Sequence, residues 1–505
     1  MYENLQYRRQ FILAAAPVTP PAGWNELKLN DYFLYTHPDL AVTEVTCREK
    51  SLVLLGHIFD SAEPEKKNVD IVKDILTRTD GMGGFFASLK PYAGNYALLY
   101  KDDREVLIAQ DALALKQIYY CTVDNRVVCG SQPNLIVNFA HPQIGRTKDR
   151  DLLDFYGNRL KETRWVGDET LYEGVKHLLP NHYLDIGRRV AKRYWPNEPV
   201  RRLDLDEAVS RSCQYLQGIL KAMALRHSLM MAVTAGTDSR VLLAASRDIR
   251  DKTYYFINNH TLGHSHPDIV VPKKLFDRIG VPFHVHDVPK DMDDEFRRIH
   301  LSNTFFVTER LLTTIYNIYF KRHGDKVNVT GTGEIGRMRF GKEPKQLNSY
   351  LAAYKLGYAD GGRYVIRQCD KILDEMLPVA RKNGINMLTL LYWEQLNGNW
   401  GTVVNAETEI AVEVFDPYAS HLLYEIFLGV DEKYVKYNEE PCVFFRDMIA
   451  RMWPELLEWP INPADTIRGK IAGFLGKTGV MGVMKELKYQ MKYAGYLYRE
   501  RLQGS

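Results

Sequence analysis

The stretch Leu229–Asp248, "LMMAVTAGTDSRVLLAASRD", joins an apolar run typical of a buried β-strand to a segment with helical spacing. Small and hydroxyl-bearing residues lie between them, from Thr234 to Ser239. Backbone N–H groups at the start of a helix, with the helix dipole behind them, can bind an anion such as phosphate. The same composition also suits an ordinary turn in which Ser, Thr and Asp cap the helix. From this stretch alone both interpretations stay open.

The residues around this stretch alternate between helical and strand patterns. We expect a long amphipathic helix over Asp206–Arg226, strands over Thr253–Asn259 and Pro282–Val288, and a helix over Ile269–Gly280. Such alternation predicts right-handed βαβ crossovers and a parallel sheet. Ligands of parallel sheets lie beyond the carboxyl ends of the strands, where the Thr234 loop emerges. This position favours the phosphate interpretation.

A second glycine-rich turn, Gly331–Gly336, follows the strand pattern "KVNVT". Asp238 lies in the first loop and Glu334 in the second. Carboxylates at neighbouring strand ends can hold Mg²⁺ against phosphate oxygens, because a hard cation prefers oxygen ligands. The first loop lacks the lysine of the P-loop pattern. The two turns therefore predict a nucleoside triphosphate site of another kind, followed by a mainly helical segment over Ser349–Asp416.

The N-terminal part has a different pattern. Short strand-like runs separated by turn residues extend from about Gln10 to about Leu184 and predict antiparallel hairpins, with one helical insert over Asn68–Thr79. Lys192–Asp206 is a plausible linker, because it carries two prolines and clustered charge. A chain of 505 residues exceeds what one core usually supports. We expect two domains, at 1–195 and 203–505.

Composition narrows the functional class. Lys and Arg number 66 and Asp and Glu 63, a formal net charge of +3, which argues against a nucleic-acid partner. The six cysteines are scattered without a CxxC pair and are typical of reduced thiols in the cytosol. The N-terminus lacks the apolar core of a signal peptide, and no apolar run is long enough to span a bilayer. We expect a cytoplasmic protein without integral membrane association.

"VTAGTDSR" resembles the SGGxDS pyrophosphate loop of the adenine nucleotide α-hydrolase superfamily. Within it the chain resembles the asparagine synthetase class, which includes β-lactam synthetases and lasso-peptide cyclases, over nearly its full length. "GNYALLYKDDREVLIAQDALALKQIYY", "TGTGEIG" and "EVFDPYAS" carry this resemblance. It implies an α/β protein with an N-terminal Ntn amidotransferase-like domain, antiparallel and β-rich. A parallel α/β domain of the ATP-pyrophosphatase type with a helical C-terminal part would follow.

The resemblance also implies roles for single residues. ATP and pyrophosphate would lie against Thr234, Ala235, Gly236, Thr237, Asp238 and Ser239, and the adenosine against Phe256, Ile257, Thr330 and Gly331. Asp238 and Glu334 would hold Mg²⁺, with Glu334 also a candidate base. Lys470 would stabilise charge on the acyl-adenylate; the alternative is a solvated loop lysine.

The implied reaction is amide formation. A small-molecule or peptide carboxylate would be adenylated with release of pyrophosphate, and an amine or ammonia would attack the acyl-AMP. One alternative is a catalytically degenerate nucleotide-binding or scaffolding protein. A tRNA-modifying sulfurtransferase or lysidine-type enzyme is a second, weakened by the near-neutral charge and the lack of paired cysteines. Monomer and homodimer both stay open.

Four departures from the family pattern affect this expectation. Tyr2 stands where glutamine-hydrolysing members carry cysteine, and Leu55 with Gly56 replaces their Asn-Gly oxyanion element, so we expect no glutaminase activity. Thr332 stands between the glycines of the second loop, and an unaided threonine is a poor base. Arg240 follows Ser239, where a small residue is usual, and would bring a cation close to the phosphates.

Two further segments allow more than one interpretation. A histidine-rich run could bind zinc or, as we favour, form a substrate-facing loop in which Asp268 is a candidate contact; its histidines and their neighbours are His260, His264, His266, His284 and His286. The basic helix expected from about Val480 could lie on anionic lipid, but docking on its own domain is favoured.

Overall fold

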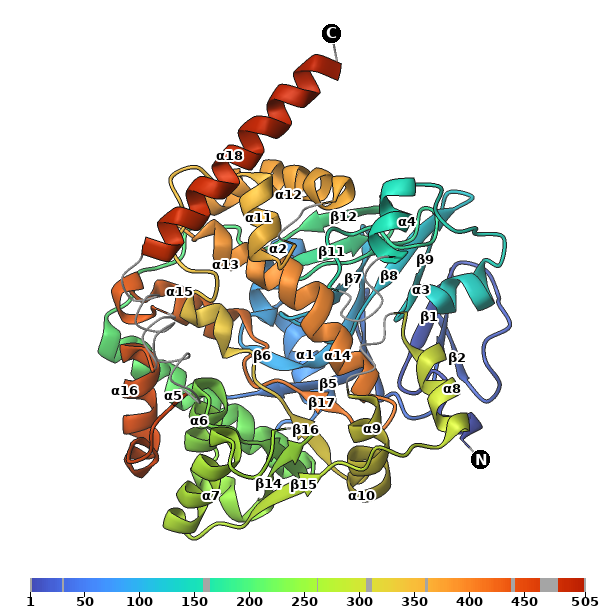
Figure 1. The fold of residues 1–505 in the computed structure, drawn as a ribbon. Coiled ribbons are helices and arrows are strands. Elements are labelled where there is room, and N and C mark those ends of the chain that lie inside the picture. The colour runs from blue at the N-terminus through green and yellow to red at the C-terminus, as the bar shows by residue number, and fades with distance from the viewer. Residues whose placement is uncertain are drawn as a thin grey trace.

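The computed structural model describes residues 2–29, 31–157, 164–260, 262–305, 311–358, 362–436, 441–463 and 480–503. Lys470 therefore lies outside the described residues. An antiparallel, β-rich N-terminal part packs against a C-terminal part built on a parallel sheet (Figure 1). This is the α/β architecture that the sequence predicts.

The strands of the N-terminal part form two antiparallel six-stranded sheets over the described residues. The first has the order β10-β8-β9-β1-β3-β2 and the second β12-β11-β7-β6-β5-β4. The first sheet contains β1 (Phe11–Ala14), β2 (Asn25–Leu29), β3 (Tyr32–Thr36), β8 (Tyr119–Val123), β9 (Arg126–Gly130) and β10 (Lys176–His177). The second contains β4 (Val42–Cys47), β5 (Lys50–Asp60), β6 (Tyr92–Lys101), β7 (Val106–Gln110), β11 (His182–Asp185) and β12 (Val190–Arg193).

These two sheets pack face to face. Phe11 and Leu13 of the first sheet share a buried cluster with Val53, Leu55 and Ala97 of the second. Alternate residues of β5 point the other way and pack on α1 (Asn68–Arg78) and α2 (Gly81–Leu89). The outer face of the first sheet packs on α3 (Pro133–Leu135) and the turn Ile136–Ala140. A layered helix–sheet–sheet–helix arrangement results.

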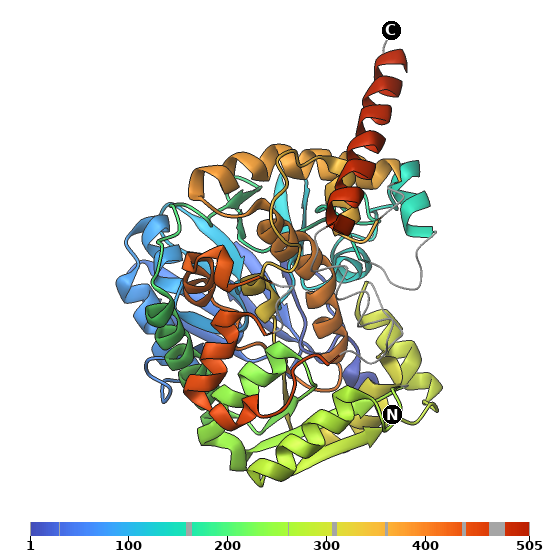
Figure 2. The same cartoon turned by 60° about the vertical axis from the view of Figure 1, so that its left-hand side comes forward.

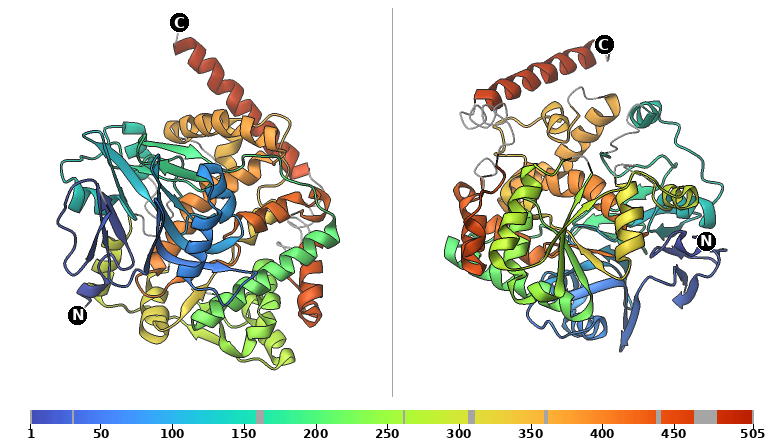
Figure 3. Two further views of the ribbon diagram at one scale, coloured as in Figure 1. Left: turned by 180° about the vertical axis from the view of Figure 1, so that it is seen from behind. Right: turned by 60° about the horizontal axis from the view of Figure 1, so that its bottom comes forward.

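The parallel sheet of the C-terminal part has the order β15-β14-β13-β16-β17. Its strands are β13 (Leu229–Ala232), β14 (Thr253–Asn259), β15 (Phe283–Asp287), β16 (Val327–Val329) and β17 (Val414–Phe415). The expected helix before β13 is α5 (Leu205–Arg226), and the crossovers contain α6 (Thr237–Ala245) and α7 (Pro267–Ile279). The alternation around Leu229 thus forms the predicted parallel sheet, seen from below in Figure 3.

The remaining segments are mostly helical, and the helices of about residues 350–400 lie on the side of the N-terminal part (Figure 2). Before β16 lie α8 (Asp294–Asn303), α9 (Leu312–Thr314), the π-helical segment η4 (Ile315–Phe320) and α10 (Lys321–His323). After it come α11 (Ser349–Lys355), α12 (Arg363–Asn383), α13 (Met387–Leu391), the π-helical segment η6 (Tyr392–Gly401) and α14 (Thr402–Thr408). α4 (Arg150–Gly157) belongs to the first part, and α15 (His421–Gly429), α16 (Val443–Met452) and α18 (Val480–Gln503) follow β17.

Three details differ from the sequence-based expectation. The mainly helical segment expected over Ser349–Asp416 does not reach Asp416, because Val414 and Phe415 form β17 at the edge of the parallel sheet. β2 and β4 are absent from the expected strands, since Asn25–Leu29 and Val42–Cys47 are largely exposed and polar. α2 is a second helix beside the expected insert.

The basic C-terminal helix α18 docks on its own chain through its middle. Tyr489 is buried and stacks on Tyr354 of α11 with ring centroids 4.5 Å apart. Asn348 Nδ2 donates to Gln490 Oε1 at 2.9 Å. The end of α18 extends past the rest of the molecule (Figure 1).

Buried ionic contacts join the two parts of the chain. Lys116, from the first part, pairs with Glu409 near the end of α14 (Nζ–Oε2 2.8 Å), and both side chains are buried. Asn95 of β6 donates to the other oxygen of Glu409 and to the carbonyl of Val414 at 3.0 Å. His57 of β5 pairs with Glu413 at 3.2 Å. The first part is thereby attached directly beside β17.

Candidate functional site

Both predicted loops leave the same edge of the parallel sheet. β13 pairs in parallel with β14 and β16, so that Ala232 aligns with Phe256 and Met231 with Val329. The N–H of Thr330 donates to the carbonyl of Phe415 at 2.9 Å. The expected juxtaposition of Thr234–Ser239 with Gly331–Gly336 is therefore observed. Phe256 and Ile257 lie in the middle of the adjoining β14, where Phe256 aligns with the last residue of β13, and both side chains are buried.

The first loop is held by its own side chains. Ser239 Oγ accepts from the N–H of Thr234 at 3.2 Å, and Thr234 Oγ1 accepts from the N–H of Gly236 at 3.0 Å. The N–H of Ala235 donates to Asp268 Oδ1 at 2.9 Å. An amide N–H of the loop that is proposed to bind an anion is thus already bonded to a carboxylate of the protein, that of Asp268 in the first turn of α7.

Asp238, in the first turn of α6, is paired with a cation from the second loop. Arg337 Nε donates to Asp238 Oδ1 at 3.1 Å and Arg337 Nη2 to Oδ2 at 2.6 Å. Arg337 is buried and Asp238 mostly buried. A bidentate pair of this kind is strong and fixes the orientation of both groups. Arg337, just after the second glycine-rich turn, is one of three alternatives to Lys470 that the sequence offers for the catalytic cation, with Arg240 and Lys342, but its pairing with Asp238 is not predicted.

Glu334 lies in the same region with different partners. Tyr392 of η6 donates its hydroxyl to Glu334 Oε2, and Arg339 Nε lies 3.8 Å from Oε1. Over the described residues, no group of three or more His, Cys, Asp and Glu side chains is arranged to hold a metal ion. A shared Asp238–Glu334 metal site stays a prediction.

Thr332 has a buried carboxylate behind it. Its hydroxyl donates to Asp416 Oδ2 at 2.6 Å, and the N–H of Tyr418 donates to Asp416 Oδ1 at 2.9 Å. Asp416 is fully buried, and this burial raises its pKa to about 7. The threonine is therefore not unaided, contrary to the expectation from its side chain alone. Asp416 lies in "EVFDPYAS", which was noted only as a family segment.

Arg240 corrects one expectation. Its guanidinium is occupied by protein carbonyls: it donates to those of Leu456 at 2.7 Å, Trp459 at 3.3 Å and Pro460 at 3.4 Å. The side chain is fully buried, and burial lowers its pKa to about 10. Arg240 therefore anchors the segment after α16 and does not bring a cation to the phosphates.

The histidines that follow β14 and those of β15 contact different residues. His260 contacts Thr314 Oγ1 at 2.9 Å, His264 lies 3.3 Å from Asp287, and His266 accepts the N–H of Asp268 at 3.1 Å. His284 stacks on Tyr254, whose hydroxyl contacts His286 Nε2 at 2.8 Å. Each of these imidazole rings thus contacts or stacks on a nearby group of the protein.

The positions at which glutamine-hydrolysing members carry their catalytic groups are packed against other residues of this chain. The N–H of Tyr2 lies 3.4 Å from Glu295 Oε1, and its ring packs against Phe296 and Phe320 of the C-terminal part. Leu55 is buried between the two antiparallel sheets. Gly56 has φ +103°, and a Cβ there would lie 2.2 Å from the carbonyl oxygen of Asn95.

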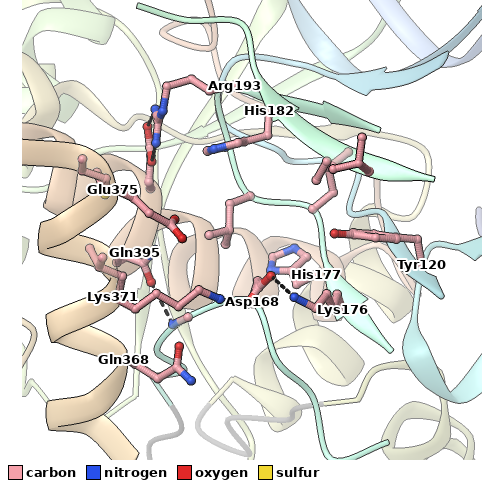
Figure 4. A pocket seen from close by; sticks show the side chains of 18 of the residues that line it. Tyr120, Asp168, Lys176, His177, His182, Arg193, Gln368, Lys371, Glu375 and Gln395 are labelled. Carbon is pink, nitrogen blue, oxygen red and sulfur yellow. Dashed lines mark hydrogen bonds and ion pairs between the residues drawn. The ribbon is translucent and has the colours of Figure 1, made fainter. Parts of the chain in front are cut away.

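A cavity of about 750 Å³ lies elsewhere, between the edges of both N-terminal sheets and helix α12 (Figure 4). Its polar lining includes Asp168, Lys176, His177, Lys371 and Glu375. This cavity is not among the sites that the sequence predicts. The only signal was polar residues such as His177 and His182 within strand-like segments.

No family model matches this chain, and no curated protein matches its sequence. Among solved structures, the chain is similar to glutamine phosphoribosylpyrophosphate amidotransferase from B. subtilis, complexed with ADP and GMP, at 10% identity and a TM-score of 0.23. The match covers 59% of this chain and 66% of that one, just under two thirds of its length.

Two further solved structures are similar at the same level. One is described as the allosteric regulatory enzyme of purine biosynthesis, with 10% identity, TM-score 0.24, and coverage of 65% of this chain and 69% of that one. The other is glutamine-dependent NAD⁺ synthetase from Acinetobacter baumannii with ADP, with 12% identity, TM-score 0.20, and coverage of 57% and 71%. Likeness of this degree assigns no activity to the chain.

Among the helices of the described residues, none combines the length and apolar character required to cross a bilayer.

Proposed function

We propose that the protein is an ATP-dependent amide-forming ligase that adenylates a small-molecule or peptide carboxylate and transfers the acyl group to an amine or ammonia. One observation carries the proposal: the hydroxyl-rich first loop and the glycine-rich second loop meet at the carboxyl edge of a parallel sheet, with Asp238 and Arg337 joined between them. Ligands of open α/β sheets bind at this edge.

The residues present fit Mg²⁺ with one condition. Mg²⁺ in nucleotide sites is commonly held by one or two carboxylates together with phosphate oxygens and water, and Asp238 supplies such a carboxylate. Each of its oxygens accepts from Arg337, so the guanidinium must share or leave the carboxylate when the ion binds. The ion would neutralise phosphate charge. Thr234, Gly236, Thr237 and Ser239 would orient the phosphates.

Thr332 and Asp416 are the candidates for taking up the proton of the attacking amine. The hydroxyl of Thr332 donates to a buried carboxylate whose pKa is about 7, close to the pH at which a general base works best. The proton would pass from the amine to Thr332 Oγ1 as the hydroxyl proton moves to Asp416. Lys470 is proposed to stabilise the developing charge and lies outside the described residues.

The N-terminal part would be structural, without glutaminase activity. The rival function is a nucleotide-binding or scaffolding protein without turnover. The Asp268 carboxylate on the amide of Ala235 favours this rival, because a phosphate would have to displace it.

Release of pyrophosphate separates the two functions. The purified protein is incubated with ATP, Mg²⁺ and a cytosolic extract of small carboxylates and amines, and AMP and pyrophosphate are measured. Asp238→Asn keeps the shape but removes the charge that holds Mg²⁺, so release should fall by about a hundredfold or more. Asp248→Asn, an exposed residue beyond α6, is the matched control. ATP binding without pyrophosphate release under any condition would support the scaffolding function.

A further inference from the structure

The cavity in Figure 4 is separate from the two loops. It is lined by residues of β8, β10, β11, β12, α12 and η6, and no residue of Thr234–Ser239 or Gly331–Gly336 lines it. β10 and β12 are edge strands of the first and second sheets, so the cavity opens where both sheets end against the C-terminal part. Its volume of about 750 Å³ lies in the range of small-molecule sites.

One end of the cavity carries an excess of positive charge. Asp168 lies between two ammonium groups, Lys176 Nζ at 2.9 Å from Oδ2 and Lys371 Nζ at 3.5 Å from Oδ1. Both lysines are more than a third exposed, so they remain accessible from the cavity. Because a single carboxylate faces two cations, this end suits an anionic group such as a second carboxylate.

The other end has an excess of negative charge. Arg193 forms a bidentate pair with buried Glu394, with Nη2 2.8 Å from Oε2, and Asn181 Nδ2 donates to the same carboxylate at 2.8 Å. Glu375 adds a second carboxylate and lies between Arg193 and Lys371 on the α12 side (Figure 4). Arg193 thus faces two carboxylates, and the second guanidinium of the lining, Arg189, directly precedes β12.

Two buried hydrogen-bond acceptors without partners lie in the wall near the positive end. Asn399 Nδ2 donates to the carbonyl of Gly167 at 3.0 Å, so Asn399 Oδ1 is the acceptor that faces His177 Nδ1 at 2.9 Å. His177 is 3% exposed, and burial lowers its pKa to about 4, so the ring is neutral with its proton on Nδ1. His177 Nε2 is therefore an acceptor, and it has no partner.

Gln368 repeats this arrangement. Its Nε2 donates to Glu169 Oε2 at 3.0 Å, whereas its Oε1 is buried without a partner. Buried polar atoms are nearly always satisfied in proteins, by protein, water or ligand. His177 Nε2 and Gln368 Oε1 both require a donor. A peptide N–H next to a carboxylate would supply one of these two donors.

We propose that this cavity binds a zwitterion of the amino-acid or short-peptide class. Its carboxylate lies against Lys176 and Lys371 and its ammonium group lies beside Glu375. In a short peptide, the N–H next to the carboxylate donates to His177 Nε2 or Gln368 Oε1. The opposite charges of the two ends disfavour a polyphosphate, which is negative throughout. This site is independent of the proposed nucleotide site and of the ligase reaction.

Calorimetric titration of the full chain, without ATP, tests the proposal. The probes are the common L-amino acids and their alanyl dipeptides with free termini, together with N-acetylated and C-amidated forms of each dipeptide that binds. We expect saturable binding for at least one free-ended probe, weakened about tenfold or more when either terminus is blocked.

Two charge variants assign the ends of the ligand. Lys371→Gln should weaken the free-carboxylate probe about tenfold and leave its C-amide unchanged, whereas Glu375→Gln should weaken the free-amine probe and leave its N-acetyl form unchanged. Lys382→Gln, exposed on the same helix, is the matched control, and unchanged melting temperatures check folding. Absence of saturable binding at millimolar concentrations across the panel, or equal affinity in all three variants, would overturn the proposal.

Discussion

At the residue scale, the candidate site is defined by charged groups that are buried in pairs or hydrogen-bonded. Asp238 and Arg337 form an ion pair, whereas Asp416 is buried with a hydroxyl and backbone amides as donors and no cation paired with it in a described salt bridge. A carboxylate in this second environment pays a desolvation cost when it ionises, which is the reason that its pKa rises to about 7. The two acids therefore respond differently to pH.

Asp416 should make folding stability depend on pH. Its pKa in the folded protein is about 7, compared with 3.8 for the ordinary side chain, so the folded state binds more protons between these values. The contribution of Asp416 to the free energy of unfolding therefore falls as pH rises from about 4 to 7, by up to about 1.4 kcal/mol per pH unit. The asparagine of the Asp416→Asn variant is neutral at every pH, so the variant does not show this fall in the free energy of unfolding.

The measurement compares melting temperatures from pH 4 to 8. The melting temperature of the Asp416→Asn protein should rise relative to that of the wild type as pH increases to about 7. Above that pH, the difference between the two melting temperatures should stay constant. Asp277→Asn, exposed on α7, should follow the wild type throughout. A constant difference between Asp416→Asn and the wild type at every pH would show that Asp416 ionises normally.

At the element scale, the glycines of the second loop allow β16 and α6 to approach closely. A Cβ on Gly331 would lie 2.7 Å from Leu242 Cδ1, and a Cβ on Gly333 would lie 2.4 Å from Asp238 Oδ1. Contacts shorter than 3.0 Å require something to shift. The run "TGTGEIG" therefore has a packing role whether or not its amides also contact a nucleotide.

Gly333→Ala should separate the two loops. The new methyl group overlaps Asp238 Oδ1, which Arg337 holds in place, so we expect a loss of about 1–3 kcal/mol of stability and weaker nucleotide binding. Calorimetry of unfolding and titration with ATP and Mg²⁺ measure the two effects. Gly83→Ala in α2, where nothing lies within 4 Å, serves as control. Unchanged stability in the Gly333→Ala protein would mean that the loops are not packed as described.

At the scale of the whole molecule, buried polar contacts attach the antiparallel sandwich to the parallel sheet. Lys116–Glu409 is the most buried of these ion pairs, and Asn95 satisfies the second oxygen of Glu409. Breaking a buried ion pair by removing one partner is costly, because the remaining charge stays buried. The attachment of the two parts should therefore depend on both charges together.

Lys116→Met should destabilise the chain by about 3–5 kcal/mol, because it leaves the Glu409 carboxylate without its cation. Adding Glu409→Gln should recover a large share of this loss, since the amide oxygen still accepts from Asn95. Scanning calorimetry of both proteins checks this, with Lys73→Met on the exposed face of α1 as control. A double variant less stable than the single one would contradict the pairing.

The whole molecule should not hydrolyse glutamine. Tyr2 packs on the C-terminal part and Leu55 is buried between the sheets, so neither a thiol nucleophile nor an asparagine oxyanion donor stands at these positions. We expect glutamate at background level when glutamine is supplied, with or without ATP. Glutamate release that ATP stimulates would contradict this and require another nucleophile.

Local sequence patterns were sufficient for much of this architecture. Thr253–Asn259 forms β14 as expected, and the Asp206–Arg226 helix and the two loops follow from periodicity and glycine positions. Asp268, Arg337 and Asp416 were not assigned their present contacts. Each meets its partner across a gap of 33 to 99 positions in the chain, and no local pattern encodes such a contact.

The sequence by itself determined the α/β class, the order of the two parts and the position of both loops at strand ends, because hydrophobic periodicity and turn residues act over short distances. Only the tertiary structure decided which charges meet. It bonded Arg240 to carbonyls of the segment after α16, paired Asp238 with a guanidinium and brought β10, β12 and α12 together around a cavity. Burial and pairing depend on segments that are distant in the chain, so they arise only when the sheets and helices have packed.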